Sequence, residues 1–263
     1  MNETADFRPG SRRLVIGVGR VLLWSGGSLW IGREGSVAQA HSHHAIQITL
    51  ALTGTVRLCH DGQAWRDYAG AVVMPHHRHR FDGCGNDTAM IFVEPETVQG
   101  QALKARFGSE PVSPLPEDAA TQMAEPLHKS FDEEADDAAL MSEARRSVAL
   151  LTGGGPIARS IDPRIERAIA WVRSRLNEPM SLEQAATQAH LSPSRFRHLF
   201  MEQTGVSFRA YLLWARVGLA VGHGMSGQPW TAAAHEAGFA DSAHLSRTCR
   251  KMFGIAPSML VRK

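Results

Sequence analysis

The sequence has few cysteines and no long apolar run, and both absences narrow the class of protein. Its three cysteines, Cys59, Cys84 and Cys249, are far apart and form no CxxC pair. They predict reduced thiols rather than a disulfide framework. No segment approaches the ~18–20 uninterrupted apolar residues of a membrane span, and the amino-terminal segment lacks a hydrophobic signal core. We therefore expect a cytoplasmic protein with no membrane partner.

Charge divides the chain. The 263 residues carry a net charge of +2, yet residues 163–263 hold 13 Lys and Arg against 6 Asp and Glu. The rest of the chain has 15 basic and 20 acidic residues. This length suggests two domains, and the Gly-rich segment TGGGP at 152–156 is the best linker. A basic domain fits phosphate contact. The alternative explanation of the basic charge is a helix that lies on a membrane surface. Such a helix would need a continuous apolar stripe beside its charges.

One pattern occurs twice in the basic part. Residues 182–207 read LEQAATQAHLSPSRFRHLFMEQTGVS, and residues 230–258 read WTAAAHEAGFADSAHLSRTCRKMFGIAPS. Their apolar positions match with an offset of 48 or 49 residues, as do the glycines Gly205 and Gly254. Each copy predicts a short helix, a tight turn and a second helix that ends at glycine. Two helix-turn-helix units on one chain predict a protein that enters successive major grooves of double-stranded DNA.

The second helix of each unit has a polar outer face. Ser192 and Pro193 predict the start of the first such helix, as N-cap and first helical residue. Helical spacing then places six residues of the first helix on the outer face: Ser194, Arg195, Arg197, His198, Met201 and Glu202. The corresponding residues of the second helix are Ser242, Ala243, Ser246, Arg247 and Arg250. The alternative is two ordinary helical hairpins with solvated charges.

The segment GFADSAHLSRTCRKMFGIAPS at 238–258 resembles the second helix-turn-helix of AraC/XylS-type transcription regulators. The matching features are Gly238-Phe239, Arg247, Arg250-Lys251, Phe253-Gly254 and Pro257-Ser258. The resemblance extends over about residues 163–263, with units at 182–205 and 230–254. The chain departs from the pattern at His190, Phe208 and Cys249. Gly218, Gly222 and Gly224 also predict a weak connecting helix, because glycine costs about 1 kcal/mol relative to Ala.

The resemblance implies roles for the outer residues. Ser194, Arg197 and His198 of the first reading helix would reach base edges, as would Ser242, Ala243 and Ser246 of the second. Arg247 would lie close to base or backbone, and Arg195, Arg250 and Lys251 would hold phosphates. The resemblance also implies RNA polymerase as a partner and a possible homodimer. Activation of transcription is the expected mode, and repression stays open as the alternative.

Residues 12–96 contain short apolar runs separated by turn signals, which predict a sandwich or barrel. The spacing of Gly35, His41-Ser42-His43, Gln47 and Gly54 resembles the first cupin motif, with Gln47 in place of its Glu. GAVVMPHHRH at 70–79 resembles a shortened second motif whose His is His79. The expected fold is α+β: a cupin-like jelly-roll barrel at 1–110, a helical segment at 111–152, a linker at 153–162 and the DNA-binding domain at 163–263.

The barrel histidines suggest a ligand site. His41, His43 and Gln47 share strand parity, so they are expected to converge with His79 inside the barrel. Parity places His44, His76 and His77 at the rim or outside. We assign the converging four to a small-molecule effector and assign no catalytic residue, metal or cofactor. A bound metal and purely structural histidines remain open.

Helices are expected at 96–107 and 117–151, separated by a Pro-rich segment. Leu140, Ala144, Ser147, Val148 and Leu151 form a stripe on the second. By resemblance, this stripe would form a dimer interface. The alternative is that it packs on the barrel of its own chain. The predicted protein is a sequence-specific transcription regulator controlled by an effector in the barrel. The alternatives are a metal-dependent cupin enzyme with an appended DNA-binding module and a DNA-architectural protein with a vestigial barrel.

Overall fold

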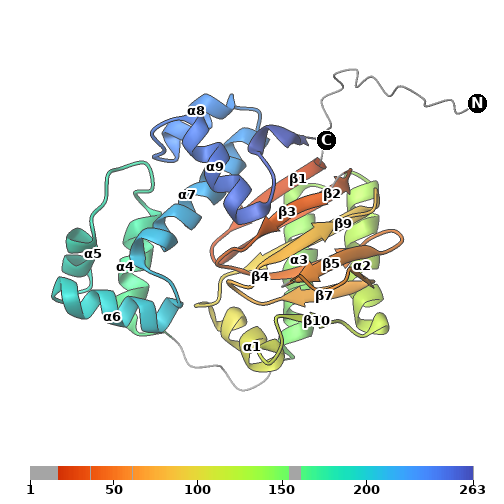
Figure 1. Ribbon diagram of the computed structural model, residues 1–263, viewed down its shortest axis with the longest axis horizontal. Coiled ribbons are helices and arrows are strands. Elements are labelled where there is room, and N and C mark those ends of the chain that lie inside the picture. Colours follow the sequence, from red (N-terminus) through yellow and green to blue (C-terminus); the bar gives the residue numbers. More distant parts are fainter. Residues whose placement is uncertain (1–16, 36, 61, 154–160, 263) are drawn as a thin grey trace, which may run out of the picture.

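The computed structural model describes residues 17–35, 37–60, 62–153 and 161–262 (Figure 1). Residues 154–160 of the expected linker lie outside the described residues. The strands are β1 (Gly17–Trp24), β2 (Gly27–Glu34), β3 (Val37–His41), β4 (Ile46–Ala51), β5 (Val56–His60), β6 (Arg66–Tyr68), β7 (Gly70–Val73), β8 (His79–Asp82), β9 (Asp87–Val93), β10 (Val112–Pro114) and β11 (Leu260–Arg262). The helices are α1 (Val98–Phe107), α2 (Glu117–Asp132), α3 (Asp137–Thr152), α4 (Pro163–Arg173), α5 (Leu182–Gln188), α6 (Pro193–Thr204), α7 (Phe208–Met225), α8 (Trp230–Glu236), α9 (Ser242–Phe253) and the short η1 (Pro257–Met259).

Two sheets form the N-terminal domain, which we call the barrel. One sheet has the strand order β10-β7-β4-β9-β2-β1-β11, and the other has the order β3-β8-β5-β6. The predicted α+β class, with a sheet-rich N-terminal domain and a helical C-terminal domain, is confirmed. The Pro-rich segment contributes β10, which pairs with β7 and extends the barrel beyond the predicted boundary at residue 110.

Strand alternation gives the larger sheet two different faces. On β4, Ile48 faces the helices, whereas Gln47 and Thr49 face the space between the sheets. On β9, Ile91 and Phe92 divide in the same way. Period-two alternation thus places Ile48 on the face that the helices cover and Gln47 on the face toward the barrel interior.

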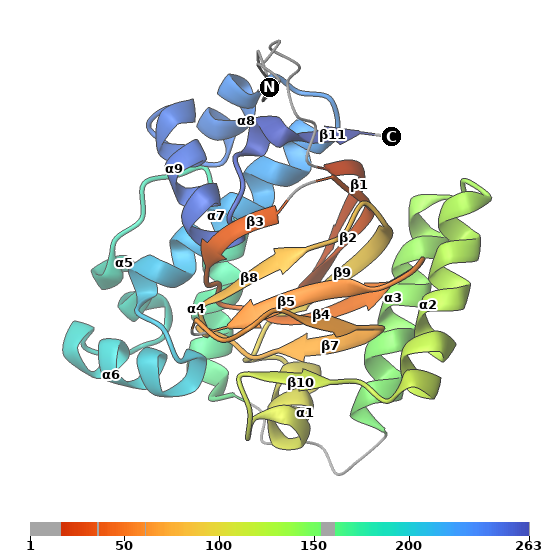
Figure 2. The same ribbon diagram turned by 45° about the vertical axis from the view of Figure 1, so that its right-hand side comes forward.

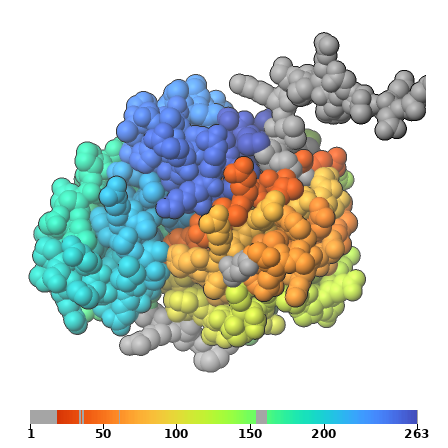
Figure 3. Space-filling view, in the orientation of Figure 1, coloured from red at the N-terminus to blue at the C-terminus, as the bar shows by residue number. Residues whose placement is uncertain are grey.

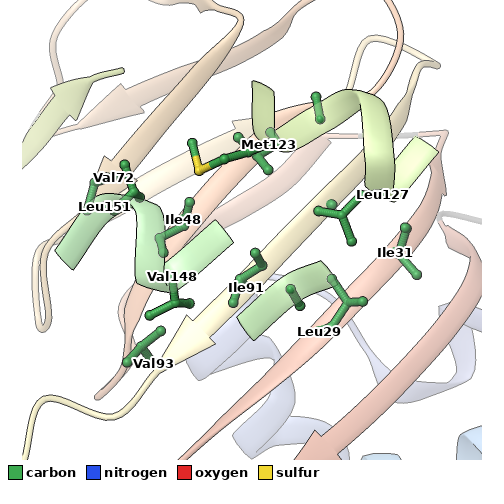
Figure 4. Close-up of a cluster of buried hydrophobic side chains, with 14 of the residues drawn as sticks. Leu29, Ile31, Ile48, Val72, Ile91, Val93, Met123, Leu127, Val148 and Leu151 are labelled. Carbon is green, nitrogen blue, oxygen red and sulfur yellow. The ribbon is translucent and has the colours of Figure 1, made fainter. Parts of the chain in front are cut away.

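Helices α2 and α3 cover the outer face of the larger sheet. Met123, Leu127, Val148 and Leu151 pack there on strand residues such as Ile91 (Figure 4). All five residues of the predicted stripe, Leu140 to Leu151, are buried within the single chain. The stripe therefore packs on its own barrel, and a dimer would have to use another surface.

The C-terminal domain contains two helix-turn-helix units, α5–α6 and α8–α9, joined by α7. The first unit closes its own core, in which Phe196, Phe200 and Tyr211 are completely buried. The second helix of the first unit begins at the predicted cap residue Ser192, and that of the second unit is capped by Asp241. Both end at glycines in the left-handed region, Gly205 (φ 79°) and Gly254 (φ 72°). The sequence therefore predicted both units correctly.

The second unit docks directly on the barrel (Figures 2 and 3). Strand β11 pairs in parallel with β1, and α7 and α9 contact β1 and β3. A single apolar cluster includes Trp30 and Phe92 of the barrel together with Trp214, Val217 and Phe253 of the C-terminal domain. The two domains consequently share a core.

The connecting helix is continuous despite its glycines. Helix α7 spans 18 residues. A Cβ at Gly222 would lie 2.6 Å from Leu23 Cδ1 of β1, and one at Gly224 would lie 2.2 Å from the Trp230 ring. These glycines therefore permit close packing on β1 and on α8, and tertiary contacts offset their low helix propensity. Among the described residues, no helix is long and apolar enough to cross a membrane.

Candidate functional site

Two exposed helix faces form the candidate DNA-reading surface. On α6, Ser194, Arg195, Arg197 and His198 are all exposed. On α9, Ala243, Arg247, Arg250 and Lys251 are exposed, whereas Ser242 and Ser246 are half-buried. The structure thus places all ten predicted residues on the second helices of the two units, and leaves every cationic side chain among them open to a phosphate or a base edge.

Local hydrogen bonds fix where each reading helix begins. The Ser192 hydroxyl accepts a hydrogen bond from the backbone N–H of Arg195 (3.3 Å), and the Asp241 carboxylate accepts one from that of His244 (2.6 Å). This bond, with Arg247 nearby, lowers the pKa of Asp241. Each cap satisfies an otherwise free N–H group and sets the rotation of the helix that follows.

The candidate ligand site lies between the two sheets. His41 is the last residue of β3 and pairs with His79 of β8. His43 lies in the connection between β3 and β4, and Gln47 lies on β4. One potential ligand atom from each of the three histidines lies within 4.8 Å of the other two. We call His41, His43 and His79 the histidine cluster.

The predicted convergence occurs, but the parity argument behind it was wrong. His41 and Gln47 are not on one strand, because the chain leaves the smaller sheet at His41 and enters the larger one at Ile46. The same crossing makes parity meaningless for His44, which is buried although parity placed it at the rim or outside. His76 and His77 are exposed, as expected.

Each histidine of the cluster is oriented by the same kind of contact. The Nδ1 atoms of His41, His43 and His79 lie 2.7, 2.8 and 3.0 Å from the backbone oxygens of Gln39, Ala45 and His77. A carbonyl oxygen can only accept, so each Nδ1 carries the proton and donates it. Nε2 is then the free base in His41 and His79, whereas His43 Nε2 lies 2.9 Å from Gln47 Oε1, a second acceptor.

Burial keeps the cluster uncharged. Desolvation, assisted by the neighbouring His79, lowers the pKa of His41 to about 3. Desolvation is also the largest cause for the other two, so the pKa of His43 lies well below its ordinary value and that of His79 is lowered. Neutral imidazoles can act as ligands to a cation, but they offer little charge to an anion.

Aromatic side chains from both domains close the cluster. The His43 ring lies 5.2 Å from Phe92, 6.1 Å from Trp214 and 6.5 Å from Phe253, measured between ring centroids. Phe253 also packs on Trp30 at 4.6 Å. Sequence reasoning missed these residues as part of the site, because the helical spacing of Trp214 and Phe253 assigns them to the core of their own domain.

A polar contact zone lies beside this aromatic closure. Arg173 of α4 forms an ion pair with Glu94 of the barrel and donates to the Tyr211 hydroxyl at 3.1 Å. Burial is the largest cause of the raised pKa of Tyr211. His44 Nε2 lies 2.9 Å from the Glu96 carboxylate.

A pocket of about 170 Å³ is lined by Leu23, Trp24, Phe92 and Trp214, with Glu94 and Arg173 among its polar residues.

Comparison with known proteins agrees with this arrangement. A family model described as a helix-turn-helix domain matches residues 185–263. The probable transcriptional regulator LumQ of Photobacterium leiognathi is 25% identical over 231 residues, covering 83% of this chain and 90% of LumQ.

Solved structures show a similar two-domain fold. ToxT from Vibrio cholerae O395 aligns with a TM-score of 0.56 and 12% identity, over 89% of this chain and 96% of ToxT. ToxT of strain SCE256 bound to an unsaturated fatty acid aligns with a TM-score of 0.55 and 11% identity, over 88% and 92% of the two chains. The helix-turn-helix match and the relative named a transcriptional regulator support the expected DNA-binding domain, and the solved structures support the fold.

Proposed function

We propose that this chain is an AraC-type DNA-binding transcription regulator that changes its activity when a ligand binds beside His41, His43, Gln47 and His79. The observation that carries the proposal is the position of these residues under the carboxy-terminal end of α9. Phe253, the last residue of α9, packs over His43. A ligand at this place would contact both the barrel and a DNA-reading helix.

Backbone contacts link the same two elements. The backbone N–H of Gln39 on β3 donates to the carbonyl oxygen of Gly254 (3.1 Å), and that of Ser42 donates to Lys251 (3.4 Å). His41 lies between these two donors in the sequence. A ligand that moves His41 would therefore move the strand end that holds α9. The ToxT structure with a bound fatty acid supports control by a small molecule in proteins of this fold.

In DNA recognition, Arg197 would read a base and Arg250 would hold a phosphate. A guanidinium fork can bond O6 and N7 of guanine together, whereas a phosphate contact carries no sequence information. Ser194, His198, Ser242, Ala243, Ser246 and Arg247 would complete base recognition, and Arg195 and Lys251 the backbone contacts. We further propose RNA polymerase as the partner and a homodimer on the operator; two reading helices per chain support recognition of paired half-sites.

The test of DNA reading compares two arginines. Once bound genomic fragments define the operator, Arg197→Ala should weaken binding to it by about 1–3 kcal/mol and relax preference at one base position. Arg250→Ala should weaken operator and scrambled DNA alike, and reduce the slope of log K against log salt by about one contact. Equal loss on both DNAs for Arg197→Ala would make that residue a backbone contact.

The test of ligand control uses the double variant His43→Ala with His79→Ala. We expect it to abolish ligand-dependent transcription in a reporter strain and to leave operator affinity without ligand within a few fold, because the reading faces are elsewhere. An unchanged response in the folded variant would show that these histidines are structural.

A further inference from the structure

A second pocket, of about 330 Å³, lies between α4 and the barrel. One wall is formed by Ser25 and Gly26, in the turn between β1 and β2, and by residues 94 and 96–98, which lead from β9 into α1. The other wall is formed by Ile161 and α4. None of the residues that line this pocket belongs to the histidine cluster. A ligand in it would therefore contact both domains at a separate place, which we call the α4 pocket.

The α4 pocket has an excess of negative charge. Three carboxylates line it, those of Glu94, Glu96 and Glu166, against the single guanidinium of Arg173. Arg173 already forms an ion pair with Glu94. Of the two remaining carboxylates, that of Glu96 is buried and that of Glu166 is exposed. The pocket thus offers two acidic groups that Arg173 does not neutralise.

Glu96 lacks contacts that a buried carboxylate requires. Its side chain is only 4% exposed, and its Oε2 lies 2.9 Å from His44 Nε2. Oε1 is buried and has no hydrogen-bond partner among the described residues. The Tyr211 hydroxyl interacts with this carboxylate but forms no hydrogen bond to Oε1. Because a buried carboxylate is costly unless it is paired and hydrogen-bonded, Oε1 is a vacant acceptor.

His44 gives Glu96 a hydrogen bond but no compensating charge. An ionised carboxylate can only accept, so the proton lies on His44 Nε2. His44 Nδ1 is also buried without a partner among the described residues. A second proton there would be a buried donor with nothing to bind, which favours the neutral imidazole. The charge of Glu96 consequently needs a cation from outside the chain.

The rest of the pocket wall is apolar. It is formed by Val98, Ile161, Ile169 and Ala170. Val98 is 46% exposed, which makes it one of the few large apolar side chains of the described residues that are open to solvent. A ligand that covered Val98 would gain from removing this apolar surface from water. The wall therefore suits an organic cation better than a hydrated metal ion, which would need several oxygen ligands.

We propose that the α4 pocket binds a small organic cation, a primary ammonium group on a short apolar body. An ammonium group has three N–H donors and no acceptor, so it would donate to Glu96 Oε1 while its charge is balanced by Glu96 and Glu166. The apolar body would lie against Val98 and Ile169.

The place of the pocket suggests an effect on the first reading helix. Ile169 lines the pocket and also belongs to the core on which α6 packs. A ligand against Ile169 would therefore touch the support of the first unit, at a place other than the histidine cluster. This regulatory meaning rests on the proposed function, whereas the binding site does not.

The first experiment uses the full wild-type chain and three probes of equal chain length: hexylammonium, hexan-1-ol and hexanoate. Hexylammonium, at ten times the Kd that calorimetric titration gives for it, should raise the Tm by about 3–6 °C. Hexan-1-ol and hexanoate at the same concentration should raise it by less than about 1 °C, because neither brings a positive charge to Glu96. Equal shifts for the three probes, or the largest shift for hexanoate, would overturn the proposal.

The second experiment locates the site. Glu96→Gln keeps the shape of the side chain and removes its charge, so it should weaken hexylammonium binding about ten-fold or more. Ala170→Leu, at an exposed position of α4, would fill part of the pocket and should weaken binding at least about three-fold without changing any charge. Glu125→Gln, at an exposed position of α2, is the matched control and should bind as the wild type does.

An unchanged Kd in either folded pocket variant would overturn the site, and Ala170→Leu decides alone if Glu96→Gln does not fold. Operator affinity with and without hexylammonium then tests regulation separately. A change of three-fold or more would support the regulatory role. Binding without any change in operator affinity would overturn only that role.

Discussion

Replacing Gly254 with alanine should separate α9 from the barrel, and Gly205 provides a matched control. Both glycines end a reading helix in the left-handed region, at φ 72° and 79°. A Cβ at Gly205 would meet only His76 Nε2, at an ordinary 3.9 Å. A Cβ at Gly254 would lie 2.3 Å from the backbone oxygen of Gln39. Only Gly254 is therefore also required by interdomain docking.

The two variants should differ by the energy of docking. An alanine held in the left-handed region costs about 1–2 kcal/mol, and both Gly205→Ala and Gly254→Ala incur this. Gly254→Ala should also lose two backbone hydrogen bonds, at about 0.5–1.5 kcal/mol each. It should further lose the Phe253–Trp30 ring contact, worth about 0.5–1.5 kcal/mol. The additional loss is about 1.5–4.5 kcal/mol.

Differential scanning calorimetry measures this difference. At about 2–4 °C per kcal/mol, Gly205→Ala should lower the Tm by about 2–8 °C, and Gly254→Ala by about 3–18 °C more. The undocked variant should also unfold in two transitions rather than one, because the domains no longer share a core. Equal Tm losses with a single transition in both variants would refute the docking argument.

Two further predictions follow from the same contacts. A double-mutant cycle of Glu94→Gln and Arg173→Gln should give a coupling of about 1–2 kcal/mol in urea unfolding, because the ion pair is mostly buried; a coupling near zero would contradict a stabilising role. Ser192→Ala and Asp241→Ala should each cost about 1 kcal/mol of stability and weaken operator binding in a mobility-shift assay. Ser181→Ala at the start of α5 removes an equivalent cap, so it should cost similar stability but leave affinity unchanged; equal affinity losses would show that the caps act only through global stability.

The helix-turn-helix units could be predicted because their signals are local. Ser192 and Asp241 lie three residues before the N–H groups that they cap, and Gly205 and Gly254 stand directly after the helices that they end. Such contacts span a few residues, so spacing in the sequence is enough to identify them.

The docked interface could not be predicted, because its contacts join residues far apart in the chain. Phe253 repeats at core spacing within α9, and nothing in the sequence tells that its ring packs on Trp30 and His43 rather than only within its own unit. From the sequence, Gly222 likewise predicts only a weak point in a helix. The structure shows that Leu23 of β1 lies beside it. The error for His44 has a different cause: parity was extended across residues 42–45, which are not a strand.

The two units resemble each other in sequence but relate differently to the barrel. The core of the first is formed by α4, α5, α6 and the start of α7, and it touches the barrel through polar groups such as Arg173. The core of the second continues into the barrel through Phe253, Trp214 and Trp30. A ligand in the barrel interior would therefore lie beside the residues on which α9 packs. The core on which α6 packs is a separate cluster. By this reasoning, the proposed control by the ligand would act on the half-site proposed for α9, while α6 would keep the protein on its operator in either state.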